Sequence, residues 1–207
     1  MSQTIRHFLG QCPLVAIIRG VTPGESEAIG TAIFDSGIRI IEVPLNSPDP
    51  LASIRRLADC LGDRALIGAG TVLDAAQVAE VQSAGGRLIV SPNTNASVIR
   101  ATVAAGMISS PGYFTPSEAF TALEAGAHAL KFFPAEGATP AVIKAQKAVL
   151  PKDVPLLVVG GIQPDNMQPW LDAGATGFGL GSGLYAPGRS AEETGERARA
   201  YVAGLRG

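Results

Sequence analysis

Short apolar runs alternate with longer amphipathic segments along nearly the whole chain. The runs are rich in β-branched and other apolar residues and are bounded by glycine or proline, which is the pattern of strands buried on both faces. They lie at residues 14–18, 38–43, 66–67, 88–90, 107–108, 129–133, 156–159 and 177–180. Their spacing of roughly 20 to 25 residues leaves room for one helix after each strand.

The segments between the runs carry helix start and stop signals. Start signals, in which proline follows a capping residue, occur at Thr22-Pro23, Ser47-Pro48, Thr115-Pro116 and Gln163-Pro164. Stop signals are glycines that follow an apolar-periodic segment, at Gly37, Gly85, Gly106, Gly126 and Gly174. Glycine is favoured there because it adopts the left-handed C-cap conformation without strain.

Eight β-then-α units predict a parallel sheet, and we expect an α/β protein with a closed (β/α)8 barrel. Residues 2–9 would add an extra N-terminal helix at the bottom of the barrel, and residues 1–207 would form a single domain. The alternative is an open doubly wound sheet. Such sheets usually carry a glycine-rich dinucleotide motif after the first strand, and residues 19–24 do not match it.

Composition narrows the function classes. The chain is 46% hydrophobic and 16% charged, with a formal net charge of −2 and no block of like charges. We therefore expect no nucleic-acid partner and no membrane partner. Residues 1–10 lack the apolar core of a signal peptide, and we expect a cytoplasmic protein. Cys12 and Cys60 have no metal-ligand spacing and are expected to be reduced core or near-core residues.

Candidate functional residues follow the strands. Active sites of (β/α)8 barrels form at the C-terminal ends of the strands, so the residues at these ends should meet in one pocket. Those that we single out are Arg19, Glu42, Asn46, Thr71, Pro92, Lys131, Phe133, Val159, Gly160, Gly161, Gly181 and Ser182.

Lys131 lies inside an apolar run that ends Leu130-Lys131-Phe132-Phe133-Pro134. Loss of water disfavours the charged ammonium and increases the neutral, nucleophilic fraction of the amine. A lysine prepared in this way can form a Schiff base with a carbonyl compound. The alternative is a lysine whose ammonium extends from the strand end to solvent.

Glu42 is a carboxylate in a strand that should be buried. A buried carboxylate needs a partner, a raised pKa, or both. Arg19 could be that partner, or its planar guanidinium could bind a substrate carboxylate. We favour an acid–base role for Glu42, because it shares the expected barrel mouth with Lys131. The two histidines, His7 and His128, do not follow strands, and we expect no metal site.

Glycines follow the last two strands. Loops at these positions of a barrel often bind phosphate through backbone N–H groups. Gly160-Gly161 and Gly181-Ser182 occupy them, and glycine also serves ordinary tight turns. Two such pairs at neighbouring strand ends indicate a phosphate site.

These motifs resemble a known family, the class I aldolases of 2-keto-3-deoxy-6-phosphosugar acids. The likeness extends from about residue 13 to residue 185, with the motifs in family order. They are Glu42-Val43-Pro44-Leu45-Asn46-Ser47, Gly68-Ala69-Gly70-Thr71-Val72-Leu73, Ser91-Pro92-Asn93, Leu130-Lys131-Phe132-Phe133-Pro134, Gly160-Gly161-Ile162 and Gly179-Leu180-Gly181-Ser182. The resemblance implies a homotrimer without metal or organic cofactor.

The resemblance also implies roles for individual residues. Lys131 would form the Schiff base and Glu42 would transfer protons. Arg19 and Thr71 would hold the pyruvyl carboxylate, while Pro92 and Phe133 would line the pocket. The terminal phosphate would lie at Gly161, Gly181 and Ser182.

Two branches of this family differ in the substrate configuration at C4. The residues Pro44-Leu45-Asn46-Ser47, and Val159 before Gly160, resemble the branch that cleaves 2-dehydro-3-deoxy-6-phosphogalactonate. The run Lys131-Phe132-Phe133-Pro134-Ala135-Glu136 is similar to the gluconate branch. We favour galactonate, with the gluconate epimer or dual specificity as the alternative.

Two other functions compete with an aldolase. A metal-dependent sugar-phosphate epimerase needs His and Asp ligands at strand ends, and the chain has no such cluster. A non-catalytic sugar-phosphate binding module would keep the glycine loops but would not need Lys131 beside Glu42.

Overall fold

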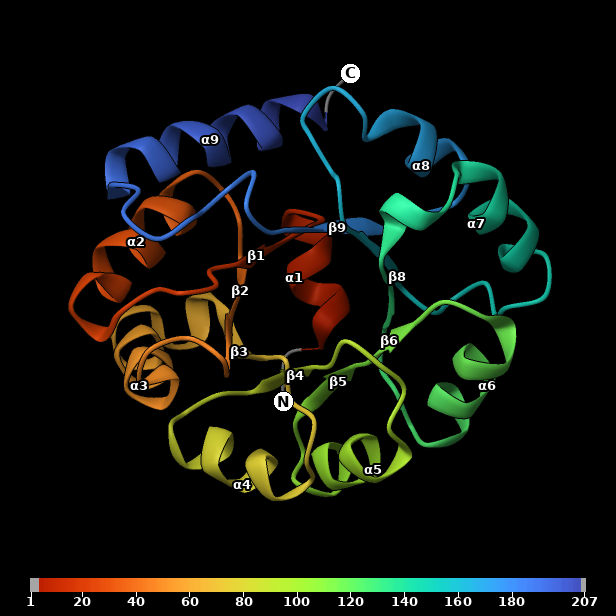
Figure 1. Ribbon diagram of the computed structural model, residues 1–207, viewed down its shortest axis with the longest axis horizontal. Helices are drawn as coiled ribbons and strands as arrows, with labels where there is room; N and C mark the ends of the chain where they lie inside the picture. Colours follow the sequence, from red (N-terminus) through yellow and green to blue (C-terminus); the bar gives the residue numbers. More distant parts are fainter. Residues whose placement is uncertain (1–3, 206–207) are drawn as a thin grey trace.

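The computed structural model describes residues 4–205, in which the predicted parallel sheet is present and closes on itself. Neighbouring strands pair in parallel in the order β5-β4-β3-β2-β1-β9-β8-β7-β6 (Figure 1). The strands are β1 (Leu14–Ile17), β2 (Ile40–Pro44), β3 (Leu66–Gly70), β4 (Leu88–Val90), β5 (Ile108–Ser110), β6 (Gly112–Tyr113), β7 (Leu130–Phe132), β8 (Leu156–Val159) and β9 (Gly177–Leu180). Each of the eight predicted apolar runs forms or begins one of these strands.

The fifth barrel strand is divided at Pro111 into β5 and β6. Its first half pairs with β4 and its second half pairs with β7. The Lys131 N–H donates to the Pro111 carbonyl at 2.9 Å, and the Ala129 N–H donates to the Ser109 carbonyl at 3.3 Å. These bonds join the two ends of the sheet, so the predicted closed (β/α)8 barrel is confirmed.

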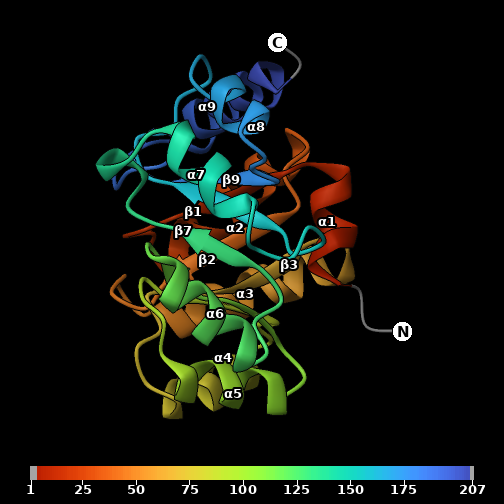
Figure 2. The same cartoon turned by 90° about the vertical axis from the view of Figure 1, so that its right-hand side faces the viewer.

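Helices surround the barrel as an outer ring, and one further helix lies across its N-terminal end (Figures 1 and 2). The helices are α1 (Ile5–Gln11), α2 (Pro23–Asp35), α3 (Pro50–Leu61), α4 (Ala76–Ser83), α5 (Ala96–Ala104), α6 (Pro116–Glu124), α7 (Pro140–Lys147), α8 (Gln168–Asp172) and α9 (Ala191–Gly204). Short 3₁₀ turns, η1 (Gly62–Arg64) and η2 (Ala135–Gly137), follow α3 and β7.

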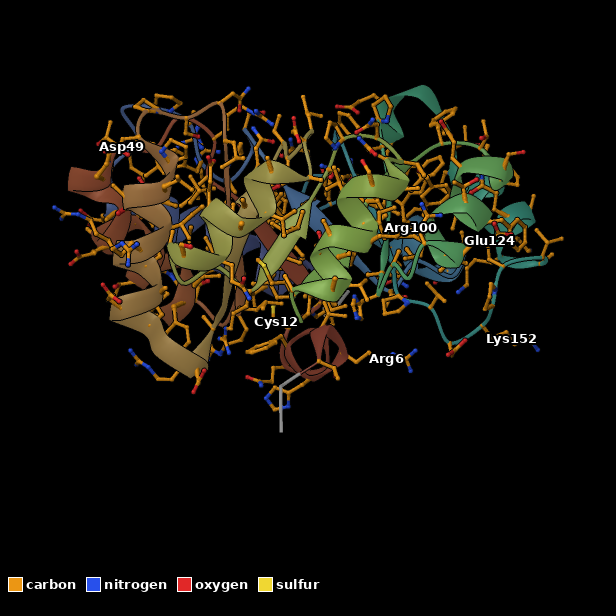
Figure 3. All side chains as sticks on the ribbon, turned by 90° about the horizontal axis from the view of Figure 1, so that it is seen from below. Arg6, Cys12, Asp49, Arg100, Glu124 and Lys152 are labelled. Atoms are coloured by element: carbon orange, nitrogen blue, oxygen red, sulfur yellow. The ribbon has the colours of Figure 1, made fainter. Side chains whose placement is uncertain are left out.

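The helix α1 is the predicted extra N-terminal helix. It covers residues 5–11 rather than 2–9, and residues 2 and 3 lie outside the described part of the chain. Ile5, Phe8 and Leu9 pack against the lower ends of the barrel strands and close that end. Figure 3 shows α1 and Arg6 at this end and Asp49, which follows β2, toward the opposite end. The open mouth of the barrel is therefore at the C-terminal ends of the strands.

Most helix signals are used as predicted, and two are not. Thr22 and Thr115 cap α2 and α6 with full capping boxes. The start predicted at Ser47-Pro48 is wrong, because α3 begins at Pro50. Ser47 instead accepts a hydrogen bond from the Gly20 N–H at 2.9 Å and fastens the loop after β1.

The start predicted at Gln163-Pro164 is also wrong, since α8 begins at Gln168. Gln163 and Asn166 bond to each other and form a turn, with the Gln163 N–H donating to Asn166 Oδ1 at 2.9 Å. The predicted stop glycines all have positive φ, in agreement with left-handed C-caps: Gly37, Gly85, Gly106, Gly126 and Gly174.

The two cysteines differ in burial. Cys12 is buried, as predicted, and Cys60 is exposed, so the prediction of a core or near-core position is wrong for Cys60. The buried stripe of α3 contains Ile54, Leu57 and Leu61, and Cys60 lies outside it. Both thiols are free.

Among residues 4–205 we find no helix that is both long enough and apolar enough to cross a membrane.

Candidate active site

The alternation of side chains along β2 and β7 directs Glu42 and Lys131 into the barrel. On β2, Ile40 packs with α1 inside the barrel, and Glu42 lies two residues further along the same face. On β7, Leu130 and Phe132 belong to the outer core under the helices, so Lys131 between them faces inward. Both side chains therefore project into the barrel near its open mouth.

Lys131 is only 7% exposed. Burial lowers the pKa of its ammonium, and the positive charge of Arg19 adds to this effect, while the Glu42 carboxylate opposes it. The Nζ atom lies 4.9 Å from the centroid of the Phe133 ring. An amine in this position is less protonated than a surface lysine, which is the condition for nucleophilic attack on a ketone.

Glu42 is 2% exposed, and its Oε2 atom has no hydrogen-bond partner among the described residues. Burial raises the pKa of its carboxyl group from 4.5 to about 7, against the opposing effects of the Lys131 and Arg19 charges. A carboxyl group with a pKa near neutrality can donate a proton in one step and accept it in another. Together with Lys131 it provides the groups that imine chemistry requires.

Arg19 binds the two residues that were expected to share its site. Its guanidinium donates to Oδ1 of Asn46, and it lies 3.4 Å from Oγ1 of Thr71. Arg19 is exposed and forms no ion pair with Glu42 within 4.0 Å in residues 4–205. The ion pair with Glu42, which one of the two interpretations of Arg19 requires, is therefore absent among these residues.

Thr71 has a left-handed backbone, with φ of 56°. This conformation is unusual for a β-branched residue, and such strain concentrates at functional sites. It follows the last residue of β3, at the point where the chain turns over the barrel mouth. The strained backbone brings the Thr71 hydroxyl to Arg19.

One cavity of about 400 Å³ at the barrel mouth brings most of the expected residues together. The predicted residues that line it are Arg19, Thr71, Pro92, Lys131, Phe133, Val159, Gly160, Gly161, Gly181 and Ser182. Asn46 does not line this cavity and is connected to it through Arg19. Glu42 also lies outside it, in the barrel floor directly below, which Lys131 and Val159 share.

The loops after β8 and β9 form another part of the cavity wall, and β9 pairs directly with β1, the strand that precedes Arg19. Gly160 and Gly161 have positive φ values of 115° and 64°, which favour glycine. At the β9 loop, Arg189 donates to the Ser182 carbonyl at 3.1 Å and places a cation beside Ser182. Glycine backbone next to an arginine is a suitable environment for an anion.

Glu136 and Tyr185 also line the cavity, and the sequence did not single them out. The turn η2 folds Glu136 back over the β8 loop, where a Cβ on Gly160 would lie 1.9 Å from its Oε2. Tyr185 is buried and donates from its hydroxyl to Glu25 Oε1 at 2.8 Å. Glu136 follows Lys131 by five residues, but only the turn geometry brings it to the cavity.

Within residues 4–205, no three His, Cys, Asp or Glu side chains are grouped so that they could hold a metal ion. The ionisable groups that line this mouth and the floor below it are instead a lysine, an arginine, a tyrosine and two carboxyl groups.

Comparisons with known proteins agree on one family. The family model described as KDPG and KHG aldolase matches residues 5–195. The 2-dehydro-3-deoxy-6-phosphogalactonate aldolase of Escherichia coli K12 is 51% identical over 194 residues, which cover 94% of this chain and 95% of that protein. The 2-dehydro-3-deoxy-phosphogluconate aldolase of Pseudoalteromonas atlantica is 34% identical, over 78% of this chain and 74% of that protein.

Solved structures give the same result. A structure described as native KDPGal superposes with a TM-score of 0.93 and 50% identity, and the match covers 95% of each chain.

Proposed function

Because the chain belongs to the KDPG and KHG aldolase family, whose members are lyases, we propose that it cleaves 2-dehydro-3-deoxy-6-phosphogalactonate to pyruvate and D-glyceraldehyde 3-phosphate. The observation that carries this proposal is the pair of buried groups at the barrel mouth. Lys131 has a lowered pKa and Glu42 has a raised one, and each is the main opposing charge for the other.

In the first half of the proposed reaction, the neutral amine of Lys131 attacks the C2 ketone. Glu42 in its acid form donates a proton to the departing hydroxyl, which leaves as water, and a protonated imine remains on Lys131. Glu42 is then a carboxylate and can remove the proton of the C4 hydroxyl. The C3–C4 electrons flow into the imine, which releases the aldehyde.

In the second half, the enamine on Lys131 takes a proton at C3 from Glu42, and water hydrolyses the resulting imine to free pyruvate. The same carboxyl group alternates between acid and base, which a pKa of about 7 permits near neutral pH. Pro92 and Phe133 line the cavity beside the reacting carbons and reduce the access of water.

Two groups of cavity residues suit the two charged ends of the substrate. Arg19, held by Asn46 and Thr71, would bind the carboxylate next to C2. Gly161, Gly181 and Ser182 would bind the phosphate through backbone N–H groups and the Ser182 hydroxyl. The cavity volume of about 400 Å³ is within the usual range for small-molecule sites.

Val159 supports the galactonate epimer as the substrate. Its side chain lines the cavity between Lys131 and the Gly160-Gly161 loop and offers no hydrogen bond to a C4 hydroxyl. The higher identity to the galactonate enzyme than to the gluconate enzyme, 51% against 34%, points in the same direction. The alternative is cleavage of the gluconate epimer, or of both. Comparing kcat/KM for the two epimers decides between them.

Borohydride trapping with pyruvate tests the central step. We expect intact-mass analysis and peptide mapping to find a reduced pyruvyl adduct on Lys131 that depends on pyruvate. An adduct on another residue, or none from folded protein, would refute the Schiff-base role of Lys131. A coupled lactate dehydrogenase assay then detects pyruvate release. Phosphosugar binding without pyruvate release would favour the non-catalytic binding module.

The proposal extends to assembly and location. The family resemblance implies a homotrimer, and the sequence pattern predicts a cytoplasmic protein in which residues 1–207 form one domain. A designed cage assembled by fusing symmetric oligomeric domains contains a chain that is 51% identical to this one, which supports self-association. Sedimentation equilibrium at several concentrations tests the trimer, and a monomeric mass throughout would exclude it.

A further inference from the structure

A small space lies in the barrel floor beneath Lys131, and Lys131 and Val159 line both this space and the substrate cavity above. Its volume is about 10 Å³, close to the space that one water molecule needs. Lys131, Glu42 and Ser110 supply its polar lining. Ile5 of α1 and apolar side chains of the barrel strands also line it.

Two of these polar groups have no hydrogen-bond partner in the described residues. They are Oε2 of Glu42 and Oγ of Ser110, and both residues are at least 98% buried. A buried oxygen without a partner is costly, so such atoms usually bond to protein or to ordered water. Here both atoms belong to residues that line the same space.

The strand register explains why Ser110 faces this space. Ser110 pairs with Val90 and Ile108 pairs with Leu88, and Leu88 and Val90 both line the floor. Ser109 pairs with Ile89, which belongs to the outer core. The two adjacent serines therefore face opposite sides of the barrel wall, which makes Ser109 a matched control.

We propose that the floor beneath Lys131 binds one water molecule between Glu42 Oε2 and Ser110 Oγ, and that Ser110 is thereby a positioning residue for the Glu42 carboxyl group. The water has hydrogens for the Glu42 carboxylate and lone pairs for the Ser110 hydroxyl. Water accounts for both unpartnered oxygens, and it is small enough for the space. The role in catalysis rests on the proposed function, in which Glu42 transfers protons at Lys131.

The proposed water has a consequence for the titration of Glu42. A hydrogen bond donated to a carboxylate favours its charged form, so the water lowers the pKa that Glu42 would otherwise have. Arg19 from the end of β1 and Lys131 from β7 are the charged groups near Glu42. The other residues that line the floor, from α1, β1, β4, β5, β8 and β9, carry no charge.

Exchange of the pyruvate methyl protons in D₂O, followed by NMR, isolates this chemistry from phosphate binding. The exchange requires only the imine on Lys131 and proton transfer by Glu42. Ser110→Val removes the hydroxyl that would hold the water, and we expect the pKa that governs exchange to rise by about one unit, the effect of one lost hydrogen bond to a carboxylate. Ser110→Thr keeps a hydroxyl and should restore the original value, and Ser109→Ala should leave it unchanged.

An unchanged pH profile in folded Ser110→Val would overturn the positioning role. Failure of the proposed function gives a different result, because the unaltered protein would then show neither exchange nor a borohydride adduct. A crystal structure of the unaltered protein tests the water site directly, even if the Ser110 variants do not fold. Density for a water within hydrogen-bond distance of both oxygens supports the site, and a floor closed by shifted side chains refutes it.

Discussion

The carboxylate of Glu42 occupies the place where a side chain on Gly70 would stand. A Cβ built on Gly70 would lie 1.7 Å from Oε2 and 2.6 Å from Oε1 of Glu42. Gly70 is the last residue of β3 and pairs with Pro44 of β2, so the two backbones are fixed side by side. Glycine is therefore required at position 70 of the Gly68-Ala69-Gly70-Thr71 motif for a steric reason. Any side chain there would collide with the carboxyl group of Glu42.

We expect Gly70→Ala to displace Glu42 and to lower kcat by about 10-fold or more, because a misplacement of about 1 Å at a reacting group can cost up to 100-fold. Gly24→Ala is the control, since a Cβ at Gly24 meets nothing within 4 Å. Steady-state kinetics of both variants make the comparison. Wild-type kcat in Gly70→Ala would show that the Glu42 carboxyl group tolerates a different position.

Lys131→Ala should abolish turnover, because among residues 4–205 no other lysine lines the cavity to form the imine. Lys144→Ala changes an exposed lysine on α7 and should retain activity. The measurement is pyruvate release in the coupled assay, with circular dichroism to verify the fold. Residual cleavage near the wild-type rate in Lys131→Ala would exclude the proposed nucleophile.

Glu42→Gln should lower kcat by about 100-fold or more, the usual effect of losing a general acid–base group. In the unaltered protein, activity should fall as the pH drops below about 7, because a Glu42 that regains a proton from solvent after the dehydration step cannot remove the C4 hydroxyl proton. The pH profile of kcat from about pH 5 to 9 measures both effects. A profile for Glu42→Gln that keeps the same acidic limb would assign that limb to another group.

Glu42 should also make folding stability depend on pH. Its folded pKa of about 7 lies above the ordinary value of 4.5, so its contribution to stability is complete below pH 4.5 and is lost as the pH rises through 7. The difference in free energy of unfolding between Glu42→Gln and the unaltered protein should therefore change with pH. From acidic to neutral pH it should shift in favour of Glu42→Gln by up to about 3 kcal/mol. Urea unfolding at both ends of this range measures the gain. A pH-independent difference between the two proteins would contradict the raised pKa.

Ser182→Ala should raise KM for the phosphorylated substrate and change kcat little, since the proposed contact is far from the reacting carbons. Ser182 lines the cavity at the β9 loop, and its carbonyl accepts a hydrogen bond from Arg189. Cleavage of the unphosphorylated analogue provides the control. An equal loss of kcat/KM for both substrates would show that Ser182 does not contact the phosphate.

The barrel was predictable because its signals are local. Each strand is an apolar run, and most helices begin at a capping residue and end at a glycine, so periodicity and caps identify the elements. The two helix starts that failed, at Ser47 and Gln163, are used in loop hydrogen bonds instead. Caps and turn residues share the same chemistry, and a single sequence does not distinguish them.

The sequence by itself determined the order of strands and helices, and with it the end of the barrel at which Lys131 and Glu42 must lie. Only the tertiary structure decided what surrounds them. It packs Gly70 against Glu42, joins Arg19 to Asn46 and Thr71, folds Glu136 over Gly160, and turns Ser110 but not Ser109 inward. These contacts depend on strand register and on loops distant in sequence. Neither leaves a local pattern, because both are set by how the closed sheet packs.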